Sequence, residues 1–326
     1  MLTRREALVA AGGALAAGTI LAPRTGAAKA SQPGTPVAFA MPENACDCHT
    51  HIIGDPRRFP FLPTRTYTPE TALPAEMLQL HKALHVQRVV IVTPSVYGTD
   101  NSATLFGMKA RGKDARGVAV IDENTSERDL DSMDRAGVRG IRLNLVTAGA
   151  VDPAAARDRF QAVIPHVQRR GWHIQLYANL DVVSGIKSLV HESPVPVVFD
   201  HFGGAKAALG VNQPGFSDLV DLVHGGQAYV KISGAYRASS KGPDYYDCSA
   251  LAQTLIAANP DRVIWGTDWP HPDNTTPPGR RPTDVTPLLQ IDDGRLLNQL
   301  ALWAPGAPIR RKILSDNPAR LYGFAL

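Results

Sequence analysis

Cysteine is scarce in this sequence: 3 cysteines among 326 residues are too few for a disulfide-stapled scaffold. The formal net charge of +4 is small, so the chain lacks the strongly basic character of a nucleic-acid-binding protein. It also lacks internal repeats, which excludes a solenoid architecture. What is present is 44% hydrophobic material. That content supports a large packed core and excludes a disordered or fibrous protein.

The N-terminal residues have the pattern of an export signal. The paired arginines Arg4 and Arg5 precede an uncharged run of small and apolar residues, and Ala28-Lys29-Ala30 forms an A-x-A cleavage motif. The run is too short and too rich in glycine and alanine to span a bilayer about 30 Å thick. We therefore expect residues 1–30 to be a twin-arginine signal peptide. Residues 31–326 would then form one domain, located in the periplasm and not held at a membrane.

Short β-type segments alternate with helical patterns along the rest of the chain. The expected strands are Cys46–Ile52, Arg88–Thr93, Gly117–Ile121, Arg139–Leu145, His173–Asn179, Pro196–His201, Ala228–Ser233 and Arg262–Asp268. The expected helices are 74–85, 101–111, 126–136, 153–170, 181–192, 215–224, 247–259, 284–302 and 308–321. Eight strands separated by helices, without a break in composition, predict an α/β fold that is a single (β/α)8 TIM barrel.

Two features refine this barrel prediction. Pro165 should kink or interrupt its helix, because proline cannot donate a backbone hydrogen bond there. Long stretches rich in proline and glycine follow the first and last strands, at 54–69 and 270–287. In a barrel such βα loops lie on the catalytic face, so we expect both to shape a substrate pocket.

The first expected strand contains the motif Cys46-Asp47-Cys48-His49-Thr50-His51. Side chains alternate along a strand, so Asp47, His49 and His51 should share one face while both cysteines take the other. Two imidazoles on one face near the C-terminal end of a barrel strand can bind one metal ion. The two cysteines should instead pack between strand and helices, because a disulfide at this spacing would be strained.

Two other strand ends carry residues that are costly to bury unless they are paired or ligated. One apolar run ends in Asp200-His201, and another ends in Asp268. In a barrel these ends open onto the same mouth as His49 and His51. His49, His51, His201 and Asp268 could therefore form a site with three imidazoles and one carboxylate, in which Asp268 is a ligand or a general base.

The motifs together resemble the amidohydrolase superfamily, in its amidohydrolase-related branch, from about Cys46 to the C-terminus. The residues that carry this resemblance are His49-Thr-His51, Asp200-His201-Phe-Gly203, Trp265-Gly-Thr-Asp268-Trp-Pro-His271 and Asp316-Asn-Pro-Ala-Arg320-Leu-Tyr322. The segments 59–69 and 138–144 look like those of lactonases that act on 2-pyrone-4,6-dicarboxylate. The same branch includes sulfomuconolactone hydrolases, decarboxylases and dehydratases.

The resemblance implies an amidohydrolase-like barrel enzyme, a hydrolase that opens an anionic lactone in aromatic-compound catabolism. It implies that Asp268 activates the hydrolytic water while His49, His51 and His201 surround the lactone carbonyl. The substrate and its acidic groups would be held by Tyr67, Ser95, Arg142, Tyr177 and Arg237. The residues alone leave other interpretations open: an internal salt bridge for Arg142, a solvated loop position for Arg237 and an ordinary core position for Tyr177.

One departure from the lactonase pattern concerns substrate charge. Those lactonases have a further substrate-binding arginine shortly after the 138–144 motif, where this chain reads Val146-Thr-Ala-Gly-Ala-Val-Asp152. A sulfonated or carboxylated muconolactone therefore fits at least as well as a pyrone dicarboxylate. Arg280 or Arg281, in the loop after the last strand, could supply the missing cation.

Metal content stays open at this level. Three neutral imidazoles and one carboxylate suit zinc, whereas the dicarboxylate lactonases are described as metal-independent. Lys231 is the one candidate for a bridging lysine, and we favour a structural or substrate role for it; His271 is a second candidate base. The alternative functions are a zinc-dependent decarboxylase of the same barrel family and a non-catalytic periplasmic binding protein. Neither the particular lactone nor the oligomeric state follows from the sequence.

Overall fold

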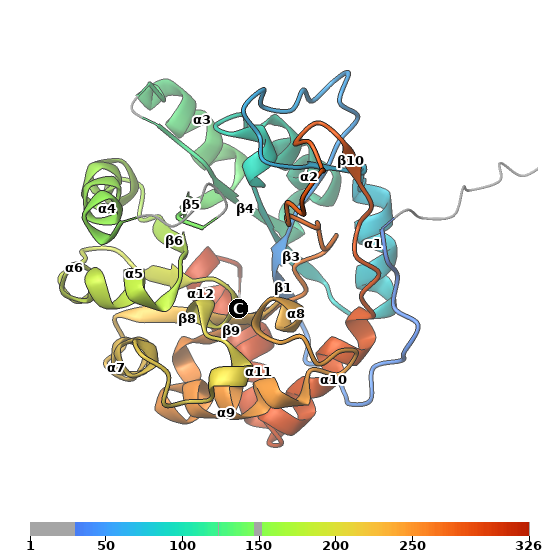
Figure 1. Ribbon diagram of the computed structural model, residues 1–326, viewed down its shortest axis with the longest axis vertical. Helices are drawn as coiled ribbons and strands as arrows, with labels where there is room; N and C mark the ends of the chain where they lie inside the picture. The colour runs from blue at the N-terminus through green and yellow to red at the C-terminus, as the bar shows by residue number, and fades with distance from the viewer. Residues whose placement is uncertain (1–29, 123, 147–151, 326) are drawn as a thin grey trace, which may run out of the picture.

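A computed structural model describes residues 30–122, 124–146 and 152–325. Eight parallel strands form one sheet in the order β1-β3-β4-β5-β6-β7-β8-β9, and helices surround it (Figure 1). The strands are β1 (Cys46–Thr50), β3 (Arg88–Val92), β4 (Ala115–Ala119), β5 (Val138–Asn144), β6 (His173–Tyr177), β7 (Val197–Phe199), β8 (Ala228–Ser233) and β9 (Val263–Gly266). Each end lies within two residues of its predicted position, and the predicted (β/α)8 barrel is confirmed.

The barrel closes where β9 meets β1. Thr50, the last residue of β1, forms a parallel bridge with Trp269, which follows β9. The amide of Asp268 donates to the carbonyl of His49 at 2.8 Å, and the amide of His51 donates to the carbonyl of Trp269 at 2.8 Å. This closure places the residues after β1 beside those after β9.

The helices lie close to their predicted positions with several differences. They are α1 (Pro74–Ala83), α2 (Ser102–Arg111), α3 (Glu127–Ala136), α4 (Pro153–Gln168), α5 (Leu180–Gly185), α6 (Lys187–His191), α7 (Phe216–His224), α8 (Ala235–Ala238), α9 (Ser249–Ala258), α10 (Asp293–Trp303), α11 (Ala307–Arg311) and α12 (Asn317–Tyr322). The predicted helix 181–192 is divided between α5 and α6 at Ile186, next to a glycine of low helix propensity. The predicted helix 284–302 begins only at Asp293, because the Asp292 side chain caps its first amides. The helix Ala235–Ala238 was not predicted, and the predicted helix 308–321 is divided by a π-helical segment at Lys312–Asp316. The expected interruption at Pro165 was wrong, since α4 continues through it.

The two long loops after the first and last strands pair with each other. Residues Thr68–Pro69 form β2 and Val285–Thr286 form β10, and these two short strands run parallel. Thr68 also donates from its hydroxyl to the carbonyl of Pro282 at 2.7 Å. The loops thereby form a joint cover on the side of the barrel where β1 and β9 end.

A β-bulge in β1 overturns the predicted alternation of its side chains. The register shifts between Asp47 and Thr50, so Cys48 and His49 together stand opposite the single residue Val90 of β3. A bulge of this kind lets two successive residues face the same side of the sheet. The two cysteines accordingly lie inside the barrel below the histidines, and not on the opposite face of the strand as expected.

The floor of the barrel is apolar and is closed by the C-terminal residues. Cys46 and Cys48 pack there as free thiols in one buried cluster. The rest of that cluster comprises Val90, Val92, Val118, Val198, Tyr229, Ile264, Ala319, Tyr322 and Phe324. Arg88 donates to the carbonyl of Ala325 at 2.5 Å and Arg116 donates to that of Gly323 at 2.8 Å, which fixes the chain end beneath the strands.

The predicted signal segment lies outside the described residues except for Ala30. The chain that follows it runs along the outside of the barrel, where the carbonyl of Ser31 accepts a hydrogen bond from the Trp269 indole at 3.1 Å. Within the described part of the chain, no helix combines the length and the hydrophobicity needed to cross a membrane.

Candidate active site

The four residues predicted to form the centre come together at the C-terminal mouth of the barrel. His49 and His51 lie at the end of β1, His201 directly follows Asp200 after β7, and Asp268 follows β9. The backbones of His201 and Asp268 have φ angles of 48° and 68°. Non-glycine residues rarely adopt this left-handed region, and such strain is typical of functional positions.

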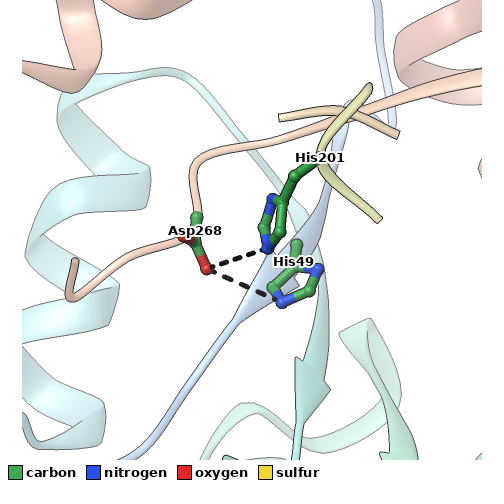
Figure 2. A group of neighbouring side chains, drawn as sticks. All are labelled: His49, His201 and Asp268. Carbon is green, nitrogen blue, oxygen red and sulfur yellow. Dashed lines mark ion pairs between the residues drawn. The ribbon is translucent and has the colours of Figure 1, made fainter. Parts of the chain in front are cut away.

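One oxygen of Asp268 faces three imidazoles. Its Oδ1 lies 3.6 Å from Nε2 of His49, 3.4 Å from Nε2 of His51 and 3.8 Å from Nε2 of His201. Figure 2 shows His49 and His201 converging on this oxygen from two different strand ends. All four side chains are almost completely buried, so their charges interact in a medium that weakens electrostatic forces little.

The other ring nitrogen of each histidine is held by a neighbouring group. Nδ1 of His51 donates to the carbonyl of Val92 at 2.7 Å, and Nδ1 of His201 is hydrogen-bonded to the hydroxyl of Ser233 at 3.0 Å. Nδ1 of His49 lies 3.1 Å from a carboxylate oxygen of Asp200. Fixing each Nδ1 in this way aims the corresponding Nε2 at the centre, which is how proteins orient metal-binding histidines.

The centre fits a metal ion. Ligand atoms of His49, His201 and Asp268 all lie within 4.8 Å of one another. Nε2 of His49 and Oδ1 of Asp268 are buried, and neither has a hydrogen-bond partner among the described residues. Nδ1 of His51 donates to Val92, so its Nε2 and the carboxylate oxygen of Asp268 need a proton or a cation between them, because two acceptors repel. Burial lowers the pKa of His201 to about 4, so this ring is neutral and able to ligate at pH 7.

The second oxygen of Asp268 is bound by two donors. Oδ2 accepts hydrogen bonds from the Tyr236 hydroxyl at 2.6 Å and from Nε of Arg237 at 2.5 Å. Burial alone would raise the pKa of Asp268, but Arg237 and the nearby His201 outweigh burial and hold it well below its usual value. Asp268 is therefore a carboxylate in a fixed orientation, with one oxygen bound and the other directed into the site.

A buried polar network lies directly beneath His49. Asp200 accepts from Nε of Arg142 at 3.1 Å and from the Gln175 amide at 3.0 Å, and Nζ of Lys231 lies 3.4 Å away. Nζ of Lys231 also donates to the Gln175 oxygen at 2.7 Å. Burial favours the neutral form of Asp200, yet His49, Lys231 and Arg142 hold its pKa well below its usual value. Lys231 therefore belongs to the buried network beneath His49, and the structural or substrate role expected for it stays a prediction.

Asp47 connects the two strands that carry the centre. Its Oδ1 accepts from the backbone amides of His49 at 3.1 Å and Thr267 at 3.0 Å. Its Oδ2 accepts from the Thr267 hydroxyl at 2.6 Å and lies 3.2 Å from Nε2 of His81 on α1. Nδ1 of that histidine faces a guanidinium nitrogen of Arg111 at 2.7 Å. Asp47 thus points outward between sheet and helix, contrary to the predicted placement beside the histidines.

The residues expected to bind substrate surround a small pocket above the centre. The predicted residues among its lining are His51, Tyr67, Ser95, Arg142, Tyr177, His201, Arg237 and Asp268. The two predicted loops also contribute, through Tyr67 on one side and Pro272 and Asn274 on the other. The ring of Tyr177 lies edge-on to His201 at 5.3 Å, with the guanidinium of Arg142 over it at 5.0 Å. Tyr177 is thus a pocket wall and not an ordinary core residue.

The two arginines are less free than expected, since each pairs with a buried carboxylate: Arg142 with Asp200 and Arg237 with Asp268. Arg142 thus forms an internal salt bridge and also lines the pocket. Arg237 is buried and does not lie in a solvated loop.

Three candidates from the sequence lie elsewhere. His271 pairs with Asp293 at 2.9 Å and packs edge-on against Tyr236. Arg280 pairs with Asp273, and Arg281 pairs with Asp284. None of these three side chains lines the small pocket. The two loop arginines therefore do not replace the cation that the sequence lacks after β5.

Two partners of the central residues were not predicted from the sequence. Tyr236, next to Arg237, binds Asp268, and Ser233 binds His201. The signal was the polar run that follows the apolar half of β8, which ends at the same mouth as the other strands.

Comparisons with known proteins agree with this geometry. The chain is 34% identical over 291 residues to a 4-sulfomuconolactone hydrolase of Rhizobium radiobacter, an alignment that covers 88% of this chain and 93% of the relative. It is 33% identical over 293 residues to a 2-pyrone-4,6-dicarboxylate hydrolase of Comamonas testosteroni, covering 87% and 92%. A crystal structure of a proposed 2-pyrone-4,6-dicarboxylic acid hydrolase from Pseudomonas putida superimposes with a TM-score of 0.71 and 29% identity, covering 87% of this chain and 98% of that one. The amidohydrolase family model matches residues 46–324, which contain every strand and all four residues of the centre, and the chain belongs to the amidohydrolase family.

Proposed function

We propose that this hydrolase opens an anionic lactone, of the carboxylated or sulfonated kind named for its relatives in aromatic-compound catabolism. One observation carries the proposal: an oriented carboxylate, Asp268, faces three imidazoles at the bottom of a pocket whose wall holds two guanidinium groups. The carboxylate supplies a base, and the guanidinium groups of Arg142 and Arg237 supply recognition of acidic substituents.

Asp268 acts on water in the proposed reaction. Its Oδ1 accepts a proton from a water molecule as the water oxygen attacks the lactone carbonyl carbon. The tetrahedral intermediate then breaks its ring carbon–oxygen bond, and the leaving ring oxygen takes the proton back from Asp268 to become a hydroxyl. The product is the ring-opened hydroxy acid, and the carboxylate is regenerated. Arg237 and Tyr236 hold Oδ2 throughout, so the reactive oxygen keeps its direction.

The imidazoles face the place where negative charge develops on the former carbonyl oxygen. We propose that His49, His51, His201 and Asp268 hold one zinc ion there. When bound, zinc polarises a carbonyl and lowers the pKa of water. Metal analysis of the purified protein tests this assignment. His49→Asn combined with His201→Asn should reduce the zinc content, whereas His191→Asn, at the distant end of α6, should leave it unchanged.

The decisive experiment compares Asp268→Asn with the natural protein on a panel of carboxylated and sulfonated lactones. The substitution keeps the shape of the side chain but removes the proton acceptor, so we expect kcat to fall by roughly 10²–10⁴ with little change in substrate affinity. Asp273→Asn, on the neighbouring loop, is the matched control. Turnover of Asp268→Asn near the natural rate would place the base elsewhere. Release of carbon dioxide in place of ring opening would indicate a decarboxylase.

We also propose that the protein is exported through its paired arginines and acts in the periplasm. The support is the sequence pattern of residues 1–30. Replacing Arg4 and Arg5 together by lysine should leave the precursor in the cytoplasm, because the arginine pair is the part of such a signal that is recognised. Cell fractionation with an antibody against the mature domain measures this. A double variant that still reaches the periplasm would contradict the proposal.

A further inference from the structure

A second, much larger cavity opens beside the small catalytic pocket. Its volume is about 620 Å³, against about 20 Å³ for the catalytic pocket. Both are lined by Ser95, Arg142 and Asn144, so these three residues form the junction between them. The ends of β4 and β5 and the helix α4, all labelled in Figure 1, contribute to its lining.

The volumes assign different roles to the two spaces. A space of about 20 Å³ holds roughly one water molecule, which is the nucleophile of the proposed reaction. A space of about 620 Å³ falls within the range of roughly 300–1,000 Å³ that small-molecule sites occupy. With the reacting carbonyl at the junction, the part of the substrate that extends beyond the small pocket must therefore lie in the larger cavity.

The walls of the larger cavity are mainly apolar. They include Val120, Ile121, Leu143, Val163 and Leu62, contributed by the ends of β4 and β5, by α4 and by the loop after β1. Val163 is buried and Leu143 is half-buried. This lining favours an apolar part of a ligand over a ring that bears only acidic groups, because the burial of apolar surface away from water lowers the free energy.

Two cations lie at the edge of the same cavity. Arg159 on α4 is exposed and forms no ion pair with any residue in the described ranges. Arg65 binds the neutral groups of Thr68 and Leu62. Elsewhere in the lining, Arg142 pairs with Asp200 and His166 pairs with Glu127. Asp122 accepts from the neutral Thr125 hydroxyl and keeps its charge, so the two cations face one carboxylate. The edge therefore favours an anionic group at a distance from the reacting centre.

We infer that the larger cavity binds an arm of the substrate: the lactone carries an extended, mainly apolar substituent that ends in an acidic group. This inference rests on the proposed function for the identity of the ring, but the cavity can be tested without turnover. It also accounts for the missing arginine after β5, because the second anionic group would be bound farther out, at Arg159 and Arg65.

The test measures binding of glutarate and of 2-alkylglutarates with progressively longer side chains, by calorimetry at constant ionic strength. These probes resemble ring-opened acids and do not react. Each added methylene should tighten binding by roughly two- to fourfold, since burying a methylene is worth about 0.8 kcal/mol. Ala162→Trp fills the cavity from α4 and should remove this gain, whereas Ala154→Trp, exposed on the same helix outside the lining, should keep it.

A second series places a carboxylate at the end of the alkyl arm. This group should tighten binding by roughly tenfold, and Arg159→Gln should remove the increment. Arg157→Gln, which alters an exposed neighbour bonded to the carbonyl of Gly185, should leave it unchanged. Melting temperatures of all four variants check that each one is folded.

Equal affinity across the alkyl series would overturn the inference, as would equal effects of the two tryptophan variants. These outcomes are separable from the fate of the proposed function. A protein that binds long-arm probes tightly but opens no lactone refutes the function and keeps the cavity assignment. A protein that opens compact lactones but binds long-arm probes no more tightly than glutarate supports the proposed function and refutes the cavity assignment.

Discussion

Replacing Asp47 by asparagine should destabilise the barrel where β1 meets β9, although the two side chains have the same shape. The amide oxygen can still accept from the backbone amides of His49 and Thr267, as Oδ1 of the carboxylate does. The new NH2 group, however, replaces Oδ2, which accepts a hydrogen bond from the Thr267 hydroxyl and faces Nε2 of His81. The substitution therefore leaves the hydroxyl hydrogen of Thr267 and the Nε2 hydrogen of His81 without the acceptor that they have in the natural protein.

The tautomer of His81 explains why this conflict cannot be relieved locally. A guanidinium nitrogen of Arg111 donates a hydrogen bond to Nδ1 of His81, so Nδ1 is an acceptor. Nε2 therefore carries the ring proton and donates it in a hydrogen bond to Asp47. Burial lowers the pKa of His81, which keeps the ring neutral near pH 7. Facing an asparagine, the ring could move its proton to Nδ1, but that nitrogen would then meet the donor of Arg111.

The expected cost follows from the number of unsatisfied groups. A buried donor left without an acceptor costs about 1–3 kcal/mol, and two are created here, so the free energy of unfolding should fall by about 2–6 kcal/mol. Asp158→Asn, exposed on α4, is the control and should change it by less than about 0.5 kcal/mol. Because the same carboxylate positions the strand ends that bear His49 and Asp268, kcat should fall in the Asp47 variant even at temperatures where it stays folded.

Denaturant unfolding of a double-mutant cycle decides the question. Arg111→Leu removes the donor that fixes the tautomer, so it should partly restore stability in the presence of Asp47→Asn, with a coupling of roughly 1–2 kcal/mol. Strictly additive costs would refute the tautomer argument. A single Asp47 variant as stable as the natural protein would refute the whole account of this contact.

Two other predictions concern charge and pH. Arg142→Met should lower kcat/KM far more for dianionic lactones than for a neutral lactone of the same ring size, by roughly 2–5 kcal/mol of transition-state stabilisation, as parallel assays would measure. The variant also removes a cation from Asp200, so its melting temperature should fall. Equal kinetic losses on both substrates would show that Arg142 has only this structural role. Burial and the nearby charge of Lys231 lower the pKa of His173 to about 3, so between about pH 6.5 and pH 3 the unfolded chain binds a proton that the folded chain does not, and this histidine should reduce stability by up to about 1.4 kcal/mol per pH unit as pH falls. Between pH 7 and pH 4, the free energy of unfolding should depend less on pH in His173→Leu than in the natural protein. The same pH dependence in both proteins would contradict this assignment.

The sequence predicted the strands well because each combines an apolar β-type run with a turn or helix signal on either side. It did not predict the bulge in β1, since strict alternation is the only rule that a short strand offers, and an inserted residue is visible only in the pairing with β3. That one residue decides which of Asp47 and Cys48 faces the barrel interior. The prediction was therefore wrong for Cys46, Asp47 and Cys48, while His49 and His51 lie where they were predicted.

The residues that form the site could be predicted from the sequence, but the hydrogen bonds and ion pairs that they form could not. Burial cost at the strand ends pointed to His201 and Asp268, and the barrel brought them together with His49 and His51 as expected. That Arg237 binds the carboxylate of Asp268 depends on how the turn after β8 is arranged. Such contacts link segments far apart in the chain, and neither spacing nor hydropathy reports on them.

The floor of the barrel has a consequence for the order in which the chain can fold. Its plug consists of Tyr322 and Phe324, and its last hydrogen bond reaches the carbonyl of Ala325. These residues are synthesised after every strand of the barrel, so the inner surface of β1 and β3 lacks its cover until they have been added. The barrel should therefore complete its fold only once this segment has left the ribosome. Shortened nascent chains, or proteins truncated before α12, should therefore remain sensitive to protease even though every barrel strand has already been made.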